Sequence, residues 1–229
     1  MKINELLAMA PANLTIQNTI ITMRQKLDID GTCVVAVSGG SDSDILVDLV
    51  EKSEKRCKVI YVFYDTGIEY QATLDHLAFL EEKYGIEIQR IRPKYPIPNA
   101  IKKYGVPLFS KKESEYIDRL QKHHFDFTSN ETFESDYSKH PKSKSALMWW
   151  HNAFGEKSSF NISQRRHLKE FLQANPPPFA ISSFCCQKAK KEPAYHTDHL
   201  YKPDLKITGI RKAEGGGASL CLQKLLYPI

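Results

Sequence analysis

A short polar segment near the N-terminus has the residue types and the spacing of a phosphate-binding loop. The sequence VVAV at 34–37 is apolar and mostly β-branched, SGGSDS follows at 38–43, and an amphipathic helical pattern begins at Ile45. A strand, a glycine turn and a helix N-terminus in this order direct backbone N–H groups and the positive end of the helix dipole at one spot. Glycines let the backbone approach a ligand closely, and serines add hydroxyl groups. The segment is therefore predicted to hold phosphate oxygens.

Two other segments would bring polar groups to the same edge of a parallel sheet. Asp65-Thr66-Gly67 follows an apolar run and supplies a carboxylate and a hydroxyl that suit a ribose or Mg²⁺. Gly209 and Arg211 follow the last apolar run, where a guanidinium can pair bidentately with phosphate or sulfate. The alternatives are a tight turn with an Asp cap at the first segment and an exposed structural arginine at the second.

The five cysteines comprise two pairs, and Cys221 near the C-terminus is the one further candidate ligand for the second pair. An odd number of cysteines argues against a disulfide framework. Cys33 and Cys57 adjoin apolar runs and are expected to be small core residues. The adjacent Cys185 and Cys186 are followed by Lys188, Lys190 and Lys191, and such an electropositive surrounding suits metal ligation by thiolates. Two core cysteines at a helix start are the alternative.

Alternating strands and helices must position the phosphate-binding segment. We expect helices at 13–28, 43–54 and 71–84 and strands at 32–37, 58–64, 86–91 and 205–208. Such alternation indicates right-handed βαβ units and a parallel sheet, with a ligand bound beyond the carboxyl ends of the strands.

The middle of the chain has a different pattern. Four prolines predict a loop over 92–107, and weak periodicity predicts a mobile loop over 125–145. Helices are expected at 111–124, 145–153 and 163–173.

The bulk composition is that of an ordinary globular protein. The chain has 229 residues, of which 41% are hydrophobic and 26% charged, and its formal net charge is +5. This mild positive charge suits anionic ligands such as nucleotides. No run of 18 apolar residues and no secretory h-region occurs, so we expect a cytoplasmic protein without a membrane partner.

Four segments in the correct order carry a family resemblance. SGGSDS at 38–43 resembles the SGGxDS loop of the PP-loop ATP pyrophosphatase superfamily. DTGIEYQAT at 65–73, CCQKAKKEP at 185–193 and TGIRKAE at 208–214 are similar to motifs of its phosphoadenosine phosphosulfate (PAPS) reductase-like branch. The resemblance covers roughly residues 30–75 and 183–214.

The resemblance implies an α/β fold, a three-layer Rossmann-like parallel sheet of the adenine nucleotide alpha hydrolase type. It implies one domain over 1–214 with a mostly helical insertion at about 92–180. The implied ligand is ATP or PAPS/APS, and the implied Mg²⁺ is held by Asp42. An iron–sulfur cluster on Cys185 and Cys186 is left open, because the ligand set is incomplete. The implied nucleotide-binding residues are Ser38, Gly39, Gly40, Ser41, Asp42, Ser43, Asp65, Thr66, Gly67, Gly209 and Arg211, and the implied catalytic residues are Asp42, Arg211, Cys185 and Cys186.

The sequence departs from the family pattern in three places. Residues 215–229 lack the further arginine expected there, and codons for this tail read one nucleotide later could restore it, so we hypothesise a frameshifted tail. The Glu-Cys-Gly-like nucleophile segment of PAPS reductases proper is absent. Ser41 stands where ATP-splitting relatives often carry lysine, which removes one cation from the phosphate site.

Three functions follow from these observations. We favour an enzyme that splits ATP between its α- and β-phosphates to adenylate an acceptor, with sulfur transfer at the cysteine pair. The alternatives are a sulfonucleotide reductase that releases sulfite and a catalytically inactive nucleotide-binding subunit. A sulfur donor, a thioredoxin-like reductant and homo-oligomerisation are left open as partners. Nucleic acid is also left open, because Trp149, Trp150 and the basic segment 165–169 could stack and pair with it; an aromatic core beside a solvated helix face is the alternative we favour.

Overall fold

The computed structural model describes residue 8 and residues 13–210, and these residues divide into two compact units. One unit contains the described residues up to Pro93 and from Glu192 onward, and we call it the sheet unit. The other contains Lys94–Lys191, and we call it the helical unit. The helical unit overlaps the insertion expected at about 92–180.

The sheet unit is built on four parallel strands in the order β3-β2-β1-β4. Their bounds are β1 Thr32–Ala36, β2 Lys58–Tyr64, β3 Ile88–Ile91 and β4 Leu205–Thr208. The sheet register pairs Val35 of β1 with Tyr61 on one side and Ile207 on the other. The predicted parallel sheet is confirmed, and β2 and β4 have the predicted bounds.

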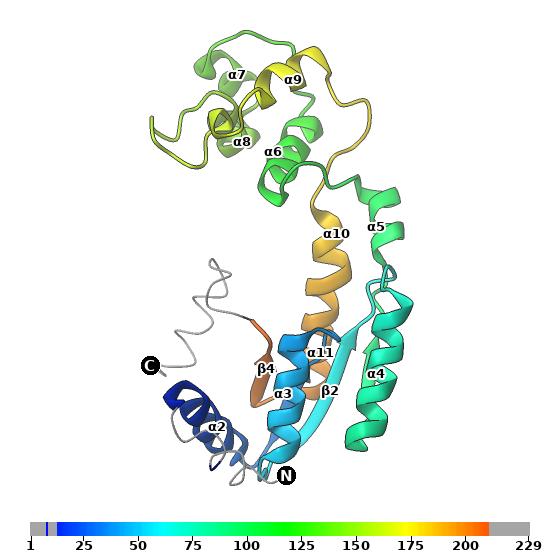
Figure 1. The fold of residues 1–229 in the computed structure, drawn as a ribbon. Helices are drawn as coiled ribbons and strands as arrows, with labels where there is room; N and C mark the ends of the chain where they lie inside the picture. The colour runs from blue at the N-terminus through cyan, green and yellow to red at the C-terminus, as the bar shows by residue number, and fades with distance from the viewer. Residues whose placement is uncertain (1–7, 9–12, 211–229) are drawn as a thin grey trace. The chain divides into compact units, whose positions relative to one another are not determined.

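Helices cover both faces of this sheet. They are α2 Leu14–Leu27, α3 Ser41–Lys52, α4 Gln71–Tyr84 and α11 Glu192–Tyr201. In Figure 1, α3 lies in front of the sheet and α11 behind it. The alternation of side chains along β1 explains both layers: Cys33 and Val35 join the core with α2, α3 and α4, while Val34 is buried on the opposite face. The predicted three-layer Rossmann-like α/β fold is confirmed.

The helical unit has its own, strongly aromatic core. Its helices are α5 Ile97–Tyr104, α6 Lys111–Lys122, α7 Phe133–Lys139, α8 Lys144–Trp150, α9 Leu168–Ala174 and α10 Phe184–Cys186, with short turns η1 Pro141–Ser143, η2 Ile162–Gln164 and η3 Gln187–Lys191. Trp149 and Trp150 are fully buried, and Phe125 and Phe127 pack edge-on against Trp150. The two tryptophans are therefore core residues, as the favoured alternative predicted, and they cannot stack on a ligand.

Two loop predictions in this unit are wrong. The expected loop at 92–107 contains α5, because Pro98 lies in its first turn, where a missing N–H costs nothing. The expected loop at 125–145 contains α7, which Thr132 caps by accepting a hydrogen bond from the Ser135 N–H.

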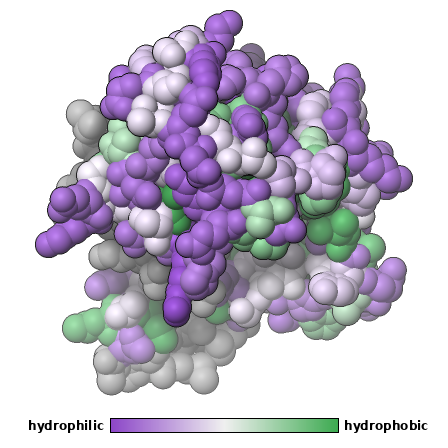
Figure 2. Space-filling view, turned by 90° about the horizontal axis from the view of Figure 1, so that it is seen from above, coloured by the Kyte–Doolittle hydropathy of each residue, from purple (hydrophilic) through white to green (hydrophobic). Residues whose placement is uncertain are grey.

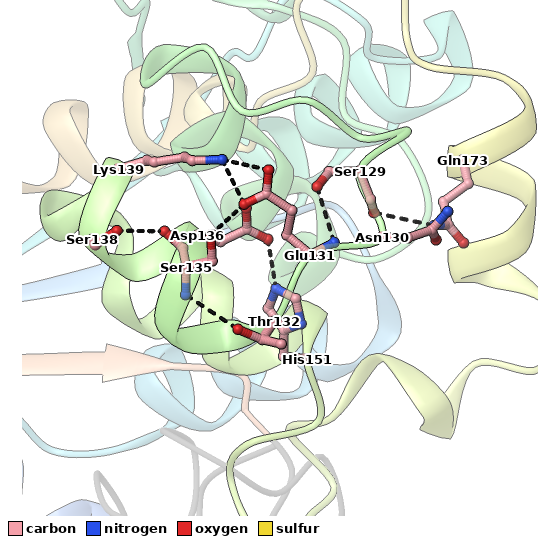
Figure 3. A network of polar contacts seen from close by, with 10 residues as sticks. All are labelled: Ser129, Asn130, Glu131, Thr132, Ser135, Asp136, Ser138, Lys139, His151 and Gln173. Atoms are coloured by element: carbon pink, nitrogen blue, oxygen red, sulfur yellow. Dashed lines mark hydrogen bonds and ion pairs between the residues drawn. The ribbon is translucent and has the colours of Figure 1, made fainter.

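A network of polar contacts holds α7 in place (Figure 3). Asp136, only 3% exposed, lies 2.8 Å from Nε2 of His151, which follows α8. Lys139 and the Ser135 hydroxyl both donate to the Glu131 carboxylate. The contact between Asp136 and His151 joins positions 15 residues apart, which explains why local periodicity did not predict this helix.

Among the described residues, none of the helices has the length and hydropathy that crossing a membrane would require.

Candidate functional site

The predicted phosphate-binding segment forms the turn between β1 and α3. Gly39 has φ +73°, in the left-handed region that favours glycine. Gly40 is the N-cap of α3, and no side chain caps this helix. The Ser43 hydroxyl, 2% exposed, donates to the Gly40 carbonyl at 2.8 Å and lies 3.3 Å from the Ser38 hydroxyl. These contacts fix the turn from its inner side, and the start of α3 can present backbone N–H groups to an acceptor such as a phosphate.

The first turn of α4 packs directly on this turn. A Cβ atom on Gly39 would lie 2.9 Å from Cγ2 of Thr73, in the first turn of α4. That distance is too short for two carbon atoms. Gly39 is therefore required both for its backbone angle and for the close approach of the turn to α4.

The segment Asp65-Thr66-Gly67 lies between β2 and α4, as predicted. The Gly67 N–H donates to Oδ1 of Asp65 at 2.9 Å, and Oδ2 lies 3.9 Å from Nε of Arg92. Thr66 is 5% exposed, and both its N–H and its hydroxyl donate to Oε1 of Glu69, at 3.2 and 2.5 Å. Asp65 is the more accessible of the two polar groups, so it is the better candidate for a ribose or a metal ion.

The end of β4 also reaches the phosphate-binding turn. A Cβ atom on Gly209 would lie 3.3 Å from the carbonyl carbon and Cβ of Asp42 and from the backbone nitrogen of Ser43. Only a very small residue fits this contact without displacing the start of α3. The turns after β1 and β2 and the end of β4 therefore meet at one edge of the sheet. Arg211, Cys221 and the tail 215–229 lie outside the described residues.

Sequence reasoning missed one pair of side chains next to this edge. Nε2 of His76 in α4 lies 2.6 Å from Oδ2 of Asp44 in α3, while Oδ1 of Asp44 is buried without a hydrogen-bond partner. The His76 ring stacks on Phe79. Both residues line a mainly apolar cavity of about 670 Å³ between α2, α3 and α4. The two positions are 32 residues apart, and no local pattern links them.

The cysteines differ in environment between the two units. Cys33 and Cys57 are buried, as expected, and burial raises the pKa of the Cys33 thiol to about 12, so this thiol is unreactive. Cys185 and Cys186 belong to the helical unit, where they are half-buried and free of disulfides.

The acidic and thiol groups set limits on metal binding. No group of three or more His, Cys, Asp or Glu side chains gathers anywhere in the described part of the chain. Mg²⁺ commonly uses one or two carboxylates together with substrate phosphates, so Asp42 or Asp65 fits that ion. A cluster needs about four thiolates, and Cys185 and Cys186 supply two, so we derive no chemistry through a cluster.

Comparison with known proteins agrees with the motifs. Residues 32–129 match the phosphoadenosine phosphosulfate reductase domain. Adenosine 5'-phosphosulfate reductase 2 of Bacillus subtilis is 31% identical over 96 residues, which are 39% of this chain and 40% of that protein. An uncharacterized protein of Methanocaldococcus jannaschii is 38% identical over 74 residues, which are 32% of this chain and 15% of that protein. The chain thus spans less than half the length of either relative.

The fold and the glycine turn define a three-layer α/β protein of the Rossmann-like type. Within that class, the chain is similar to the PAPS reductase-like family over residues 32–129, in agreement with its motifs.

Proposed function

We propose that the sheet unit binds an adenine nucleotide and that the protein acts at its phosphate or sulfate group. The observation that carries this proposal is the glycine turn at the start of α3, where Gly40 is the N-cap and both the turn at Gly39 and the end of β4 at Gly209 approach closely. A helix N-terminus preceded by glycines lets an anion approach closely and offers it backbone donors. The family match over 32–129 supports the same reading, because the family acts on adenine nucleotides.

The reaction we favour is cleavage of ATP between its α- and β-phosphates. An acceptor nucleophile attacks the α-phosphorus, the bond to the bridging oxygen breaks, and pyrophosphate leaves with the bonding electrons. Backbone N–H groups at the start of α3 stabilise the negative charge on the phosphates. Asp42 and Asp65 are the carboxylates available to orient the nucleotide or hold Mg²⁺, which would supply further charge stabilisation. Arg211 stays a predicted partner of the phosphates.

Reduction of a sulfonucleotide is the second candidate, favoured by the similarity to the adenosine 5'-phosphosulfate reductase of Bacillus subtilis. In that reaction a thiolate attacks the sulfur of APS or PAPS, the sulfur–oxygen bond to the nucleotide breaks, and a thioredoxin-like reductant supplies the two electrons that release sulfite. A nucleotide-binding subunit without turnover is the third candidate.

Calorimetric titration with Mg²⁺-ATP, APS and PAPS separates these functions. We expect ATP binding that Ser38→Ala and Asp42→Asn weaken at least about tenfold, since each removes a polar group from the site. Ser163→Ala and Glu134→Gln are matched controls, because both side chains are exposed and lie in the helical unit.

The outcome also decides what is measured next. ATP binding justifies a pyrophosphate-release assay, and binding without release favours the inactive subunit. Binding of APS or PAPS without ATP favours the reductase. Binding of none of the three nucleotides would overturn the proposal.

A further inference from the structure

Charge is distributed very unequally between the two units. Residues 94–191 contain 17 of the 32 Lys and Arg but only 9 of the 27 Asp and Glu. The helical unit is therefore strongly basic, whereas the rest of the chain has a slight acidic excess. This positive charge is more than the binding of a mononucleotide would require. Concentrated in one compact unit, it attracts polyanions.

Aromatic rings are exposed on this basic unit. Phe109, Phe160 and Phe171 each have a fractional exposure of 51%, although the core beneath already buries two tryptophans. The Phe109 and Phe171 rings meet edge to face with centroids 6.3 Å apart. Phe109 also has φ +59°, an unfavourable backbone angle for a bulky residue. The chain thus keeps a large ring at the surface at an energetic cost.

Cations are held beside these rings. Nζ of Lys112 lies 5.1 Å from the centroid of Phe160 and donates to the Ser159 carbonyl at 2.7 Å. The Arg165 side chain is 61% exposed, and its Nε lies 3.2 Å from the buried Glu113 carboxylate, which fixes the base of the guanidinium. Lys111 precedes Lys112 in the sequence, Arg166 follows Arg165, and both of these further cations are exposed. Rings and cations therefore come together around the N-terminus of α6 and the start of α9.

We propose that this surface, consisting of Phe109, Lys111, Lys112, Phe160, Arg166 and Phe171, binds single-stranded nucleic acid. Exposed rings stack on unpaired bases of any sequence, and flanking cations contact the phosphates. A duplex offers the cations its phosphates but not its base faces. Stacking and phosphate contacts need no sugar hydroxyl, so RNA and DNA strands bind alike.

The surface fits a nucleic acid better than an apolar partner. In Figure 2, hydrophilic residues dominate the coloured part of the face toward the viewer, and hydrophobic residues lie there in small, separate areas. An obligate protein interface would need a continuous apolar core.

Fluorescence anisotropy of the full-length chain with labelled single strands of about 15 nucleotides tests the proposal. We expect binding that weakens steeply between about 50 and 200 mM salt. The triple variant Lys111→Gln, Lys112→Gln, Arg166→Gln should lower the log–log salt slope by about 2 to 3. The control Lys26→Gln, Lys58→Gln removes exposed charges from the sheet unit and should leave the slope unchanged.

The rings are tested separately from the charges. Phe160→Leu with Phe171→Leu keeps the apolar bulk but removes the aromatic faces, and should weaken single-strand binding about tenfold. Phe79→Leu, at an equally exposed ring of the sheet unit, is the matched control. Thermal unfolding of each variant shows whether the fold is retained.

Three outcomes would overturn the proposal: no binding, equal loss in the controls, or duplex binding as tight as single-strand binding with no effect of the ring variants. The last outcome would indicate a purely electrostatic surface. The assay contains no mononucleotide, so its failure is distinguishable from failure of the proposed function.

Discussion

The sheet unit and the helical unit differ in how their cores are built and in where their polar groups lie. In the sheet unit, aliphatic strands form the core, and candidate ligand groups lie on turns at the carboxyl ends of the strands. In the helical unit, short helices enclose two tryptophans, and cations and rings lie on the outside. The comparison shows that a βαβ pattern in the sequence predicts where a binding site lies. In a unit of short helices, a binding surface can be recognised only from the structure.

The largest expected effect is a loss of stability when a leucine in the core of either unit is shortened to alanine. Leu77 belongs to the core of the sheet unit and Leu147 to that of the helical unit, and both are fully buried. Either Leu→Ala change should cost about 2–5 kcal/mol, since it removes buried methyl groups and leaves a cavity. Because the two cores share no residue, calorimetry should show each variant lowering a different unfolding transition. If both variants lower one common transition equally, the two cores unfold together and the comparison fails.

The next effect is on the phosphate-binding turn. Gly39→Ala places a Cβ atom 2.9 Å from Thr73 Cγ2, so the turn must move, and nucleotide affinity should fall at least about tenfold. Gly85→Ala is a matched control, because Gly85 also has positive φ (+62°) but no atom within 4 Å of the added Cβ. It should cost about 1 kcal/mol of stability and leave affinity unchanged. Equal losses of affinity in titration calorimetry would mean that strain, not the contact with Thr73, explains the effect.

The smallest effect is a pH dependence in the sheet unit. Burial alone would raise the pKa of Asp48, but hydrogen bonds from Lys52 and Tyr84 outweigh it and hold the pKa below its usual value. The stabilisation is therefore complete above the ordinary pKa of an aspartate and is lost as pH falls through the lowered pKa.

Asp48→Asn tests this dependence. It should lower the free energy of unfolding by about 1 kcal/mol at neutral pH, and the difference should vanish in acid. The control is Glu82→Gln, at an exposed position of α4. Urea titrations across pH measure both variants, and a difference that persists in acid would contradict the assignment.

Local sequence signals predicted the sheet unit well. The helix expected at 13–28 is observed, and the side chain of its N-cap, Asn13, accepts a hydrogen bond from the Ile16 N–H. The predicted bounds of β2, α4 and β4 agree with the structure because apolar runs, turn residues and Gly85 mark their ends. The same signals placed the turn at 38–43.

The other features of the fold and of the candidate site depend on contacts between residues that are far apart in the sequence. α7 is held by the buried pair of Asp136 and His151, and the site edge gains His76 through its contact with Asp44. The Phe109 and Phe171 rings meet across 62 positions of sequence. None of these contacts has a periodic pattern, so only tertiary structure shows them.

The place of β4 in the sheet has a consequence for how the chain is synthesised. β4 pairs with β1, yet the entire helical unit, Lys94–Lys191, is translated between the two strands. About 170 residues separate β1 from β4, so at about 5–20 residues per second the outer edge of β1 waits roughly 8–34 s on the ribosome for its partner. During that time its hydrogen-bonding groups are open to pairing with other chains. Slower translation of the helical unit should therefore increase aggregation of the nascent chain.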